Sequence, residues 1–276
     1  MTRVVVIGAA GRMGRHLVAG IAKSQDLKLV GATEMAGSPF LGHDAGTVAG
    51  VEYCGVAISS ELAPLLAGAD ALIDFSTGPV IENASKAVSL NCAVVIGTTA
   101  LGDKGRDALE ALAQKGGRIV FASNMSVGVN LLFHISAEVA RVLGEDYDIE
   151  IVEMHHNQKK DSPSGTAVSL AESVAAARGL SYKDAVRHGR EGIVGARTKN
   201  EIGMHAVRGG DVVGDHTVIF ATGGERVELT HKASSRDTFA KGALRAVRFL
   251  KSAAPGLYNM QDVLGLPGCG QKKPLG

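Results

Sequence analysis

The stretch that decides the fold lies near the N-terminus, at residues 4–14: Val-Val-Val-Ile-Gly-Ala-Ala-Gly-Arg-Met-Gly. Its four apolar residues predict a buried strand, Val4–Ile7, and the helical periodicity after it predicts a helix over Met13–Ser24. Between them, small residues spaced G-x-x-G-x-x-G let the backbone approach a pyrophosphate, whose charge the amides and dipole of a helix N-terminus stabilise. The spacing is a variant of the commoner dinucleotide-binding fingerprint, and a glycine-rich turn can also serve tight packing only.

The next strand supplies the context that favours nucleotide binding. Leu27–Thr33 is predicted to be that strand, and Glu34 follows Gly14 at the distance where an acidic residue meets the adenosine ribose hydroxyls. A strand before the turn, a helix after it and this carboxylate together indicate a dinucleotide site rather than a purely structural turn. The sequence contains no GxxxxGKS or GxxxxGKT pattern, which disfavours a nucleotide-hydrolysing phosphate loop.

Apolar runs rich in valine and isoleucine alternate with segments of helical periodicity through the first half of the chain. Further strands are predicted at Ala71–Phe75, Ala93–Gly97 and Ile119–Ala122, with one helix beginning near Pro79 and another over Lys104–Lys115. Strand, helix and strand in repetition predict an α/β fold with a doubly wound (Rossmann-like) parallel sheet, covered by helices on both faces.

The pattern changes after residue 127. A helix at 130–143 is followed by strand-like segments at Asp148–His155, Ile202–Arg208, Thr217–Ala221 and Val227–His231, with a helix over Thr166–Arg178 between the first two. Strands in succession predict a second, α+β domain with an antiparallel or mixed sheet. Because the last helix, Thr238–Leu250, can return to the first domain, we expect residues 1–126 and 238–276 to form a dinucleotide-binding domain and residues 127–237 the second domain.

Composition limits the remaining classes of protein. The chain has 276 residues, 36 of them glycine, and a formal net charge of +1, which gives no electrostatic footprint for nucleic acid or an anionic membrane. Three cysteines without CxxC spacing and an N-terminus without a signal-peptide pattern favour a reducing cytoplasm. Residues 119–137 contain no Asp, Glu, Lys or Arg, but their Ser, Asn and Gly residues favour a buried strand, turn and helix over a membrane span.

The densest group of polar residues is Glu153–Thr166, which begins where a strand ends and finishes where a helix begins. A helix N-terminus capped by Ser164, with lysines nearby, suits a substrate that bears carboxylates. His155 or His156 could donate a proton, and Lys159 could act as a donor or an electrostatic stabiliser. Three other interpretations compete: a metal site, which lacks a Cys or HExxH partner; a basic loop that contacts phosphates; and a solvated loop. We favour the catalytic or substrate-binding role and expect no metal.

Three further features have both a structural and a functional interpretation. The turns Gly97–Thr99 and Ala122–Met125 follow predicted parallel strands, where ligands bind in such sheets, so each could contact a nicotinamide ring and its ribose or be an ordinary loop. The run Thr230–Arg236 could complete an anion site or serve the entry to the last helix. Cys92 adjoins an apolar strand and is predicted to be a core residue rather than a nucleophile.

Three of these motifs, Gly8–Gly14, Gly97–Thr99 and Glu153–Thr166, closely resemble those of the 4-hydroxy-tetrahydrodipicolinate (dihydrodipicolinate) reductase family. The likeness runs from Val4 to about Leu266; the cluster with His155 and Thr166 is highly specific to the family, whereas the nucleotide fingerprint is shared far more widely. The resemblance implies a homotetrameric enzyme of bacterial lysine and diaminopimelate biosynthesis. It would reduce a cyclic, dicarboxylated imine with NADH or NADPH, with loss of water, to give tetrahydrodipicolinate, and its second domain would carry the tetramer interface.

The resemblance also implies roles for the matching positions, residue by residue. His155 looks like the proton donor and acceptor of the family, and Lys159 like its second proton donor. His156, Gly165 and Thr166 look like substrate contacts. The implied cofactor contacts are Gly8, Ala9, Ala10, Gly11, Arg12, Met13, Glu34, Gly97, Thr98, Thr99, Ala122, Ser123, Asn124 and Met125.

One position departs from a common pattern of the family. After the acidic residue some members carry an arginine that can pair with a 2′-phosphate, and here that residue is Met35. Methionine cannot supply a charge-assisted hydrogen bond, and Glu34 repels phosphate. We therefore expect a preference for NADH, with NADPH tolerated through Arg12 or a neighbouring cation. Two rival functions remain: another two-domain dehydrogenase of amino acids or semialdehydes, and a non-catalytic sensor that binds nicotinamide nucleotide.

Overall fold

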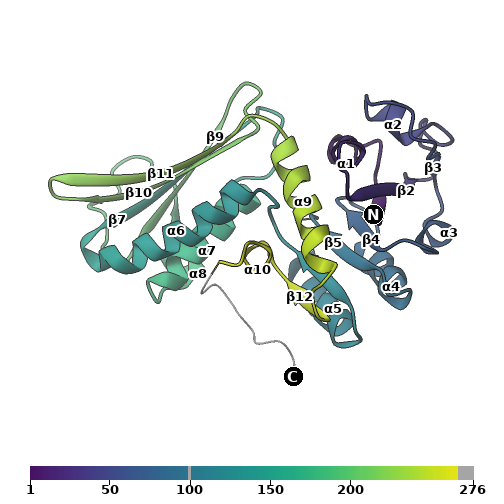
Figure 1. Ribbon diagram of the computed structural model, residues 1–276. Coiled ribbons are helices and arrows are strands. Elements are labelled where there is room, and N and C mark those ends of the chain that lie inside the picture. The colour runs from purple at the N-terminus through teal and green to yellow at the C-terminus, as the bar shows by residue number, and fades with distance from the viewer. Residues whose placement is uncertain (99–100, 267–276) are drawn as a thin grey trace. The chain divides into compact units, whose positions relative to one another are not determined.

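The computed structural model describes residues 1–98 and 101–266 of the chain (Figure 1). The described chain forms two compact units, Met1–Val127 with Arg236–Gly276, and Gly128–Ser235. We call them unit 1 and unit 2. Thr99, Ala100 and the third cysteine, Cys269, lie outside the described residues.

Unit 1 is built on a seven-stranded sheet in the order β12-β6-β5-β4-β1-β2-β3. Every pair of neighbouring strands is parallel. The strands are β1 (Thr2–Ile7), β2 (Leu27–Thr33), β3 (Ile58–Ser59), β4 (Ala71–Asp74), β5 (Ala93–Ile96), β6 (Arg118–Phe121) and β12 (Gly256–Tyr258). The strand order reverses between β1 and β4, the point at which open α/β sheets bind ligands beyond the carboxyl ends of their strands.

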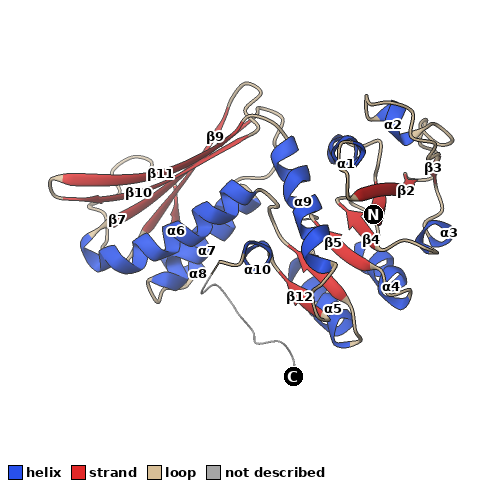
Figure 2. Ribbon diagram, in the orientation of Figure 1, coloured by secondary structure: helices blue, strands red, loops and turns tan. Residues whose placement is uncertain are grey.

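Helices cover both faces of this sheet (Figure 2). Leu17 of α1 (Arg12–Ala22) and Leu244 of α9 (Asp237–Leu250) belong to the core on one face. Ala84 of α4 (Val80–Ser89) and Leu109 of α5 (Gly102–Gln114) belong to the core on the other. The described part of unit 1 also contains three short helices, α2 (Ala45–Val48), α3 (Ala63–Leu66) and α10 (Met260–Leu264). The predicted doubly wound parallel sheet is therefore confirmed.

Unit 2 is built on a five-stranded mixed sheet in the order β11-β10-β7-β9-β8. Its strands are β7 (Asp148–His155), β8 (Val186–His188), β9 (Ile202–Arg208), β10 (Gly214–Thr222) and β11 (Glu225–Ala233). Strand β9 is parallel to β7 and β8, whereas β10 is antiparallel to β7 and β11. The mixed sheet agrees with the prediction from successive strand segments.

One face of the unit 2 sheet carries a helical layer, and the burial of β7 alternates accordingly. Phe133 of α6 (Val127–Leu143) and Leu170 of α7 (Gly165–Ala177) pack with Ile149 and Ile151 of β7. A single turn, η1 (Gly144–Asp146), and the short α8 (Tyr182–Ala185) join these elements. The side chains of Glu153 and His155 follow Ile149 and Ile151 on the same buried face of the strand.

The uncharged stretch 119–137 is divided between β6, a turn and the first part of α6, as predicted. Helix α6 and η1 together are long and apolar enough to cross a membrane by length and composition, with a mean hydropathy of 1.3. Leu132 and Phe133 nevertheless belong to the core of unit 2, so α6 acts there as a core helix.

Some bounds differ from those predicted. Strands β10 and β11 have nine residues each, longer than predicted. In β11 the added residues include Glu225 and Arg226, charged side chains that an exposed edge strand accommodates. The helix expected near Pro79 begins at Val80, and Pro79 occupies the N-cap position rather than the first turn. The short elements β3, β8, β12, α2, α3, α8 and α10 carry too few residues to show a periodicity.

Candidate active site

The glycine-rich turn connects β1 to α1 in unit 1. Gly8 has a φ of +69°, a conformation that favours glycine. A Cβ on Gly14 would lie 2.0 Å from the carbonyl oxygen of Gly8, so the helix can approach the turn only with glycine at that position. Gly11 is the N-cap residue of α1 and supplies no side-chain cap. The first amides of the helix therefore remain open to an anion, and these residues fit the pyrophosphate of a dinucleotide.

Glu34 is fixed against this turn. Its Oε1 accepts a hydrogen bond from the Ala10 amide at 3.0 Å, and its Oε2 accepts one from the Met35 amide at 3.3 Å. The carboxylate thus lies beside the turn, as the expected contact with ribose hydroxyls requires. Met35 has 74% of its surface exposed and offers no polar group to a ligand.

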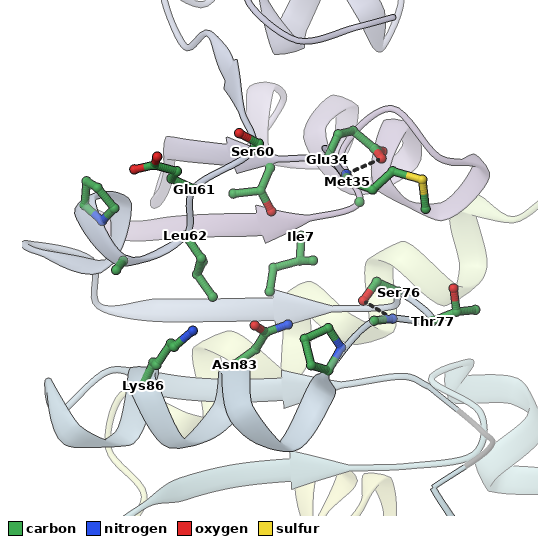
Figure 3. A pocket seen from close by; sticks show the side chains of 16 residues that line it. Ile7, Glu34, Met35, Ser60, Glu61, Leu62, Ser76, Thr77, Asn83 and Lys86 are labelled. Atoms are coloured by element: carbon green, nitrogen blue, oxygen red, sulfur yellow. Dashed lines mark hydrogen bonds between the residues drawn. The ribbon is translucent and has the colours of Figure 1, made fainter. Parts of the chain in front are cut away.

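A cavity of about 550 Å³ opens beside Gly8 and Glu34 at the carboxyl ends of the strands (Figure 3). Three segments complete its lining: residues 60–64 after β3, residues 76–79 after β4, and Asn83 and Lys86 of α4. None of these three lining segments was predicted from the sequence to contact a ligand. The available signal was the Ser-Thr pair at residues 76–77, which comes soon after an apolar strand, as Glu34 does.

The turn after β5 supports the turn after β4. A Cβ on Gly97 would lie 2.1 Å from the Phe75 ring, so glycine is required here for packing. The hydroxyl of Thr98 donates to the carbonyl of Ser76 at 2.8 Å. Asp74 holds the same turn from the other side, because its carboxylate accepts from the Ser76 amide at 2.8 Å and from the Asn83 amide group at 3.1 Å. The expected cofactor contact at Thr99 lies outside the described residues.

The turn after β6, Ala122–Met125, has a core residue at its end. The Met125 side chain is buried in the core of unit 1. The side-chain oxygen of Asn124 accepts from the Ser126 amide at 2.8 Å, which closes the turn. A Cβ on Gly242 of α9 would lie 1.7 Å from the Met125 carbonyl oxygen, so the helix crosses directly over this turn. The side chain of Met125 is therefore committed to packing, and a cofactor contact there would involve the backbone.

A buried carboxylate organises the polar cluster of unit 2. Oε2 of Glu153 lies 2.6 Å from Nδ1 of His155. Arg208 of β9 donates from Nη1 to Oε2 and from Nη2 to Oε1, both at 2.9 Å. The Ser164 amide donates to Oε1 at 3.0 Å. Burial alone would raise the pKa of Glu153, but the hydrogen bonds from His155, Arg208 and Ser164 bring this pKa down to about 2.

A second histidine packs beside His155. The ring of His216 lies edge-on to that of His155, with centroids 5.2 Å apart. Nε2 of His216 lies 3.1 Å from the Ser164 hydroxyl. Burial is the main cause that lowers the pKa of His216 to about 3, and Lys159 is among the neighbours that add to it, so this ring is neutral over the physiological pH range. His216 was not selected from the sequence.

The two remaining candidates in the loop differ in their surroundings. Nζ of Lys159 binds both carboxylate oxygens of Asp161, at 2.9 and 2.8 Å, and this pairing lowers the pKa of Asp161 against the effect of burial. His156 is half-buried rather than buried; its Nδ1 accepts from the Gln158 amide at 3.2 Å. His155, by contrast, is joined to a buried carboxylate.

The N-terminus of α7 lies beside this cluster. Ser164 is the N-cap, and its hydroxyl accepts from the Ala167 amide at 3.1 Å, as predicted. Apart from its chain neighbours and the backbone of its own helix, no described atom would lie within 4 Å of a Cβ on Gly165, so the space beside this first residue of the helix is open. Thr166 is mostly buried. The loop therefore presents an open helix N-terminus next to Lys159 and His155, an arrangement suited to an anionic ligand.

The last two candidates, Cys92 and the run Thr230–Arg236, have mainly structural surroundings. Cys92 is buried in the core of unit 1, as predicted, and burial raises the pKa of its thiol to about 12, which disfavours a nucleophilic thiolate. His231 faces His216 across the β10–β11 pair, and burial lowers its pKa. Arg236 occupies the N-cap position of α9, which is the helix-entry role.

Unit 1 has the sheet order and the open glycine turn of enzymes that use a dinucleotide, and unit 2 places His155 and Lys159, side chains able to transfer a proton, near a helix N-terminus able to bind an anion. The chain is thus a two-unit oxidoreductase. Comparisons with known proteins identify the family of oxidoreductases to which the chain belongs. Residues 2–125 match the model of the dihydrodipicolinate reductase N-terminus, and residues 128–264 match that of the dihydrodipicolinate reductase C-terminus. The chain belongs to the dihydrodipicolinate reductase family.

Relatives and a solved structure agree with this assignment. A 4-hydroxy-tetrahydrodipicolinate reductase of Syntrophotalea carbinolica is 51% identical, over 96% of this chain and 100% of the relative. One of Geotalea uraniireducens is 49% identical over the same shares. The dipicolinate-bound dihydrodipicolinate reductase of Paenisporosarcina sp. TG-14 superposes with a TM-score of 0.75 at 25% identity, covering 95% of this chain and 98% of that one.

Proposed function

We infer that the protein is a 4-hydroxy-tetrahydrodipicolinate reductase, which uses NADH or NADPH to form tetrahydrodipicolinate. The overall reaction consumes the hydroxylated ring, one reduced nicotinamide and one proton, and it releases tetrahydrodipicolinate, oxidised nicotinamide and water. The observation that carries this proposal is the cluster of unit 2, where a buried carboxylate, His155 and Lys159 adjoin an open helix N-terminus. The full-length similarity to reductases of that name supports the choice of substrate.

The residues of unit 2 account for the proton chemistry and for binding of the substrate. A bound nicotinamide supplies the hydride, and a proton must reach the adjacent ring position. We assign this proton to His155, with Lys159 as the second donor. The amides of Gly165 and Thr166 at the start of α7, with His156, hold a substrate carboxylate. Lys159 would leave Asp161 to take part, which is feasible because that ion pair is on a loop and Asp161 is exposed.

The residues of unit 1 account for the dinucleotide. The open amides of α1 and the small residues Gly8–Gly14 hold the pyrophosphate, and Glu34 accepts hydrogen bonds from the ribose hydroxyls. Because the Glu34 carboxylate lies at the turn and Met35 provides no cation, we propose that NADH is preferred. We also propose that the active protein is a cytoplasmic homotetramer whose contacts are made by unit 2.

The test is an initial-rate assay with NADH and then NADPH, in which an aldol-type condensing enzyme generates the substrate from pyruvate and aspartate semialdehyde. Turnover is expected, with a higher kcat/KM for NADH. Lys159→Ala and His155→Gln should each lower kcat by about 10²–10⁴-fold while NADH binding and the fold persist. The matched control is Lys160→Ala, which removes the adjacent, exposed lysine and should leave kcat unchanged. Cofactor binding without turnover by the wild type would favour the nucleotide-sensor hypothesis.

A further inference from the structure

We propose that Glu153 is a positioning residue for the proposed reaction: it holds the His155 imidazole with the proton on Nδ1, so that Nε2 is the nitrogen that exchanges a proton. The inference rests on the proposed function for its kinetic consequence, but the hydrogen bond itself is a property of the protein alone. The Glu153 side chain is fully buried and that of His155 is 11% exposed, so water does not compete for this 2.6 Å contact.

The charge state of Glu153 determines the tautomer. Arg208 binds both oxygens of Glu153, and a fixed guanidinium pairing of this kind keeps a carboxylate ionised. An ionised carboxylate can only accept hydrogen bonds. The nitrogen that faces it, Nδ1 of His155, must therefore be the donor, as in other enzymes where a carboxylate fixes the tautomer of a catalytic histidine.

The position of Nε2 agrees with this assignment. Gly214, the first residue of β10, lies beside that nitrogen: a Cβ at this position would be 3.0 Å from Nε2. The absence of a side chain on Gly214 leaves room next to the atom that we assign to proton exchange. The tautomer with the proton on Nδ1 presents an unprotonated Nε2 to that space, where it can receive and return a proton.

The Glu153 carboxylate also connects other parts of the cluster. This connection is a competing, purely structural explanation of why Glu153 is buried. Oε1 of Glu153 accepts from the Ser164 amide at the start of α7. Arg208, besides binding Glu153, donates to the backbone carbonyl of Asp161, whose side chain binds Lys159. A structural role predicts lower stability or weaker substrate binding after substitution, and a positioning role predicts a changed tautomer and a lower kcat.

The test is Glu153→Gln, which has nearly the same shape. Its oxygen is expected at the Oε1 position, where the Ser164 amide and Nη2 of Arg208 both donate, so its NH₂ group faces Nδ1 of His155. The proton should then move to Nε2. In protein labelled with ¹⁵N in its histidine rings, and assigned by comparison with His155→Gln, the shifts of Nδ1 and Nε2 should exchange their protonated and unprotonated positions. We expect kcat to fall at least about 100-fold, since the wrong tautomer costs about 10⁴-fold in a serine-protease triad, while KM and the NADH dissociation constant stay within about threefold.

The matched control is Glu150→Gln, three residues before Glu153 and on the opposite face of β7. Glu150 forms the equivalent contact with Nε2 of His205, at 2.7 Å, and lies outside the proposed site. We expect this variant to keep kcat and the His155 signals. Glu153→Asp provides a second variant in case the glutamine variant does not fold: it keeps the charge and so the tautomer, but its shorter side chain should lower kcat about tenfold.

The results separate this inference from the proposed function. An unchanged His155 tautomer in folded Glu153→Gln, or a kcat within threefold of wild type in either Glu153 variant, would overturn the positioning role even if the wild type is an active reductase. Absence of turnover by the wild type would contradict the proposed function, and the ¹⁵N comparison would still decide whether Glu153 sets the tautomer.

Discussion

Gly214 provides the space beside His155, and its replacement by alanine is expected to impair turnover while the protein stays folded. The added Cβ would lie 3.0 Å from Nε2 of His155, 3.4 Å from Cδ2 and 3.7 Å from Cε1 of His216. Carbon and nitrogen atoms in van der Waals contact are about 3.5–4.0 Å apart. The His155 ring must therefore retreat by about 0.5 Å from the new methyl group.

The contacts on the other sides of the His155 ring make this displacement energetically costly. On one edge Nδ1 is held by Glu153 at 2.6 Å, and the His216 ring packs edge-on with centroids 5.2 Å apart. A shift of 0.5 Å must distort one of these contacts, and overpacking of this size costs about 1–3 kcal/mol. Because a misplacement of about 1 Å can cost about 10²-fold in rate, we expect kcat to fall about tenfold.

Three measurements test the reasoning about Gly214. The initial rate under saturating substrate gives kcat, a fluorescence titration gives the NADH dissociation constant, and a thermal melt gives the Tm. NADH affinity should be unchanged because the glycine turn belongs to unit 1. The matched control is Gly223→Ala in the turn of the same hairpin, where no described atom lies within 4 Å of the new Cβ. A wild-type kcat in Gly214→Ala would refute the claim that the His155 ring must occupy its observed position.

Four further substitutions test other parts of the site and the fold. Met35→Arg should raise the NADPH/NADH ratio of kcat/KM by about two- to fivefold, since an exposed ion pair contributes at most about 1 kcal/mol. Steady-state kinetics with both cofactors measures this ratio. Gly242→Ala, which places a Cβ 1.7 Å from the Met125 carbonyl, should lower the free energy of unfolding by about 3 kcal/mol or more in denaturant titrations. Gly20→Ala should cost less, because its new Cβ meets only a movable leucine methyl at 2.9 Å. Burial lowers the pKa of His216 to about 3, so below pH 6.5 this histidine binds a proton in the unfolded chain but not in the folded protein. Its contribution to stability is therefore complete above pH 6.5 and is lost as the pH falls toward 3. His216→Gln should reduce the pH dependence of the free energy of unfolding by up to about 1.4 kcal/mol per pH unit, measured in melts between pH 6 and 4.5.

The long elements of the fold could be predicted because their patterns are local. β2, β7 and β9 have the predicted bounds, since each is a run of alternating or continuous apolar residues between polar loops. The sheet order and the pairing of β9 with β7 could not be predicted. Forty-six residues separate the ends of those strands, and parallel pairing across such a connection depends on tertiary packing rather than on local sequence.

The candidate site shows the same division between local and distant residues. His155, Lys159 and Gly165 lie within one loop and could be selected together, and Glu34 follows the glycine turn at a characteristic distance. Arg208 and His216 belong to other strands. The register places Arg208 opposite His155 in β9 and His216 opposite Glu153 in β10, and one residue of slip would turn each side chain to the other face. Their roles follow from the register, which the sequence does not reveal.

The burial of Glu153 is better explained by function than by stability. The preceding inward positions of β7 hold Ile149 and Ile151, so an apolar residue would continue the core at position 153. A buried ion pair such as Glu153 with Arg208 contributes little net stability, because the loss of hydration offsets most of the attraction. A lone buried carboxylate would also repel a dicarboxylated substrate at the neighbouring helix N-terminus, and the Arg208 guanidinium cancels that charge. The pair therefore places an ionised acceptor behind His155 without adding negative charge to the site, and apolar residues at these two positions could keep the fold but could not fix the tautomer.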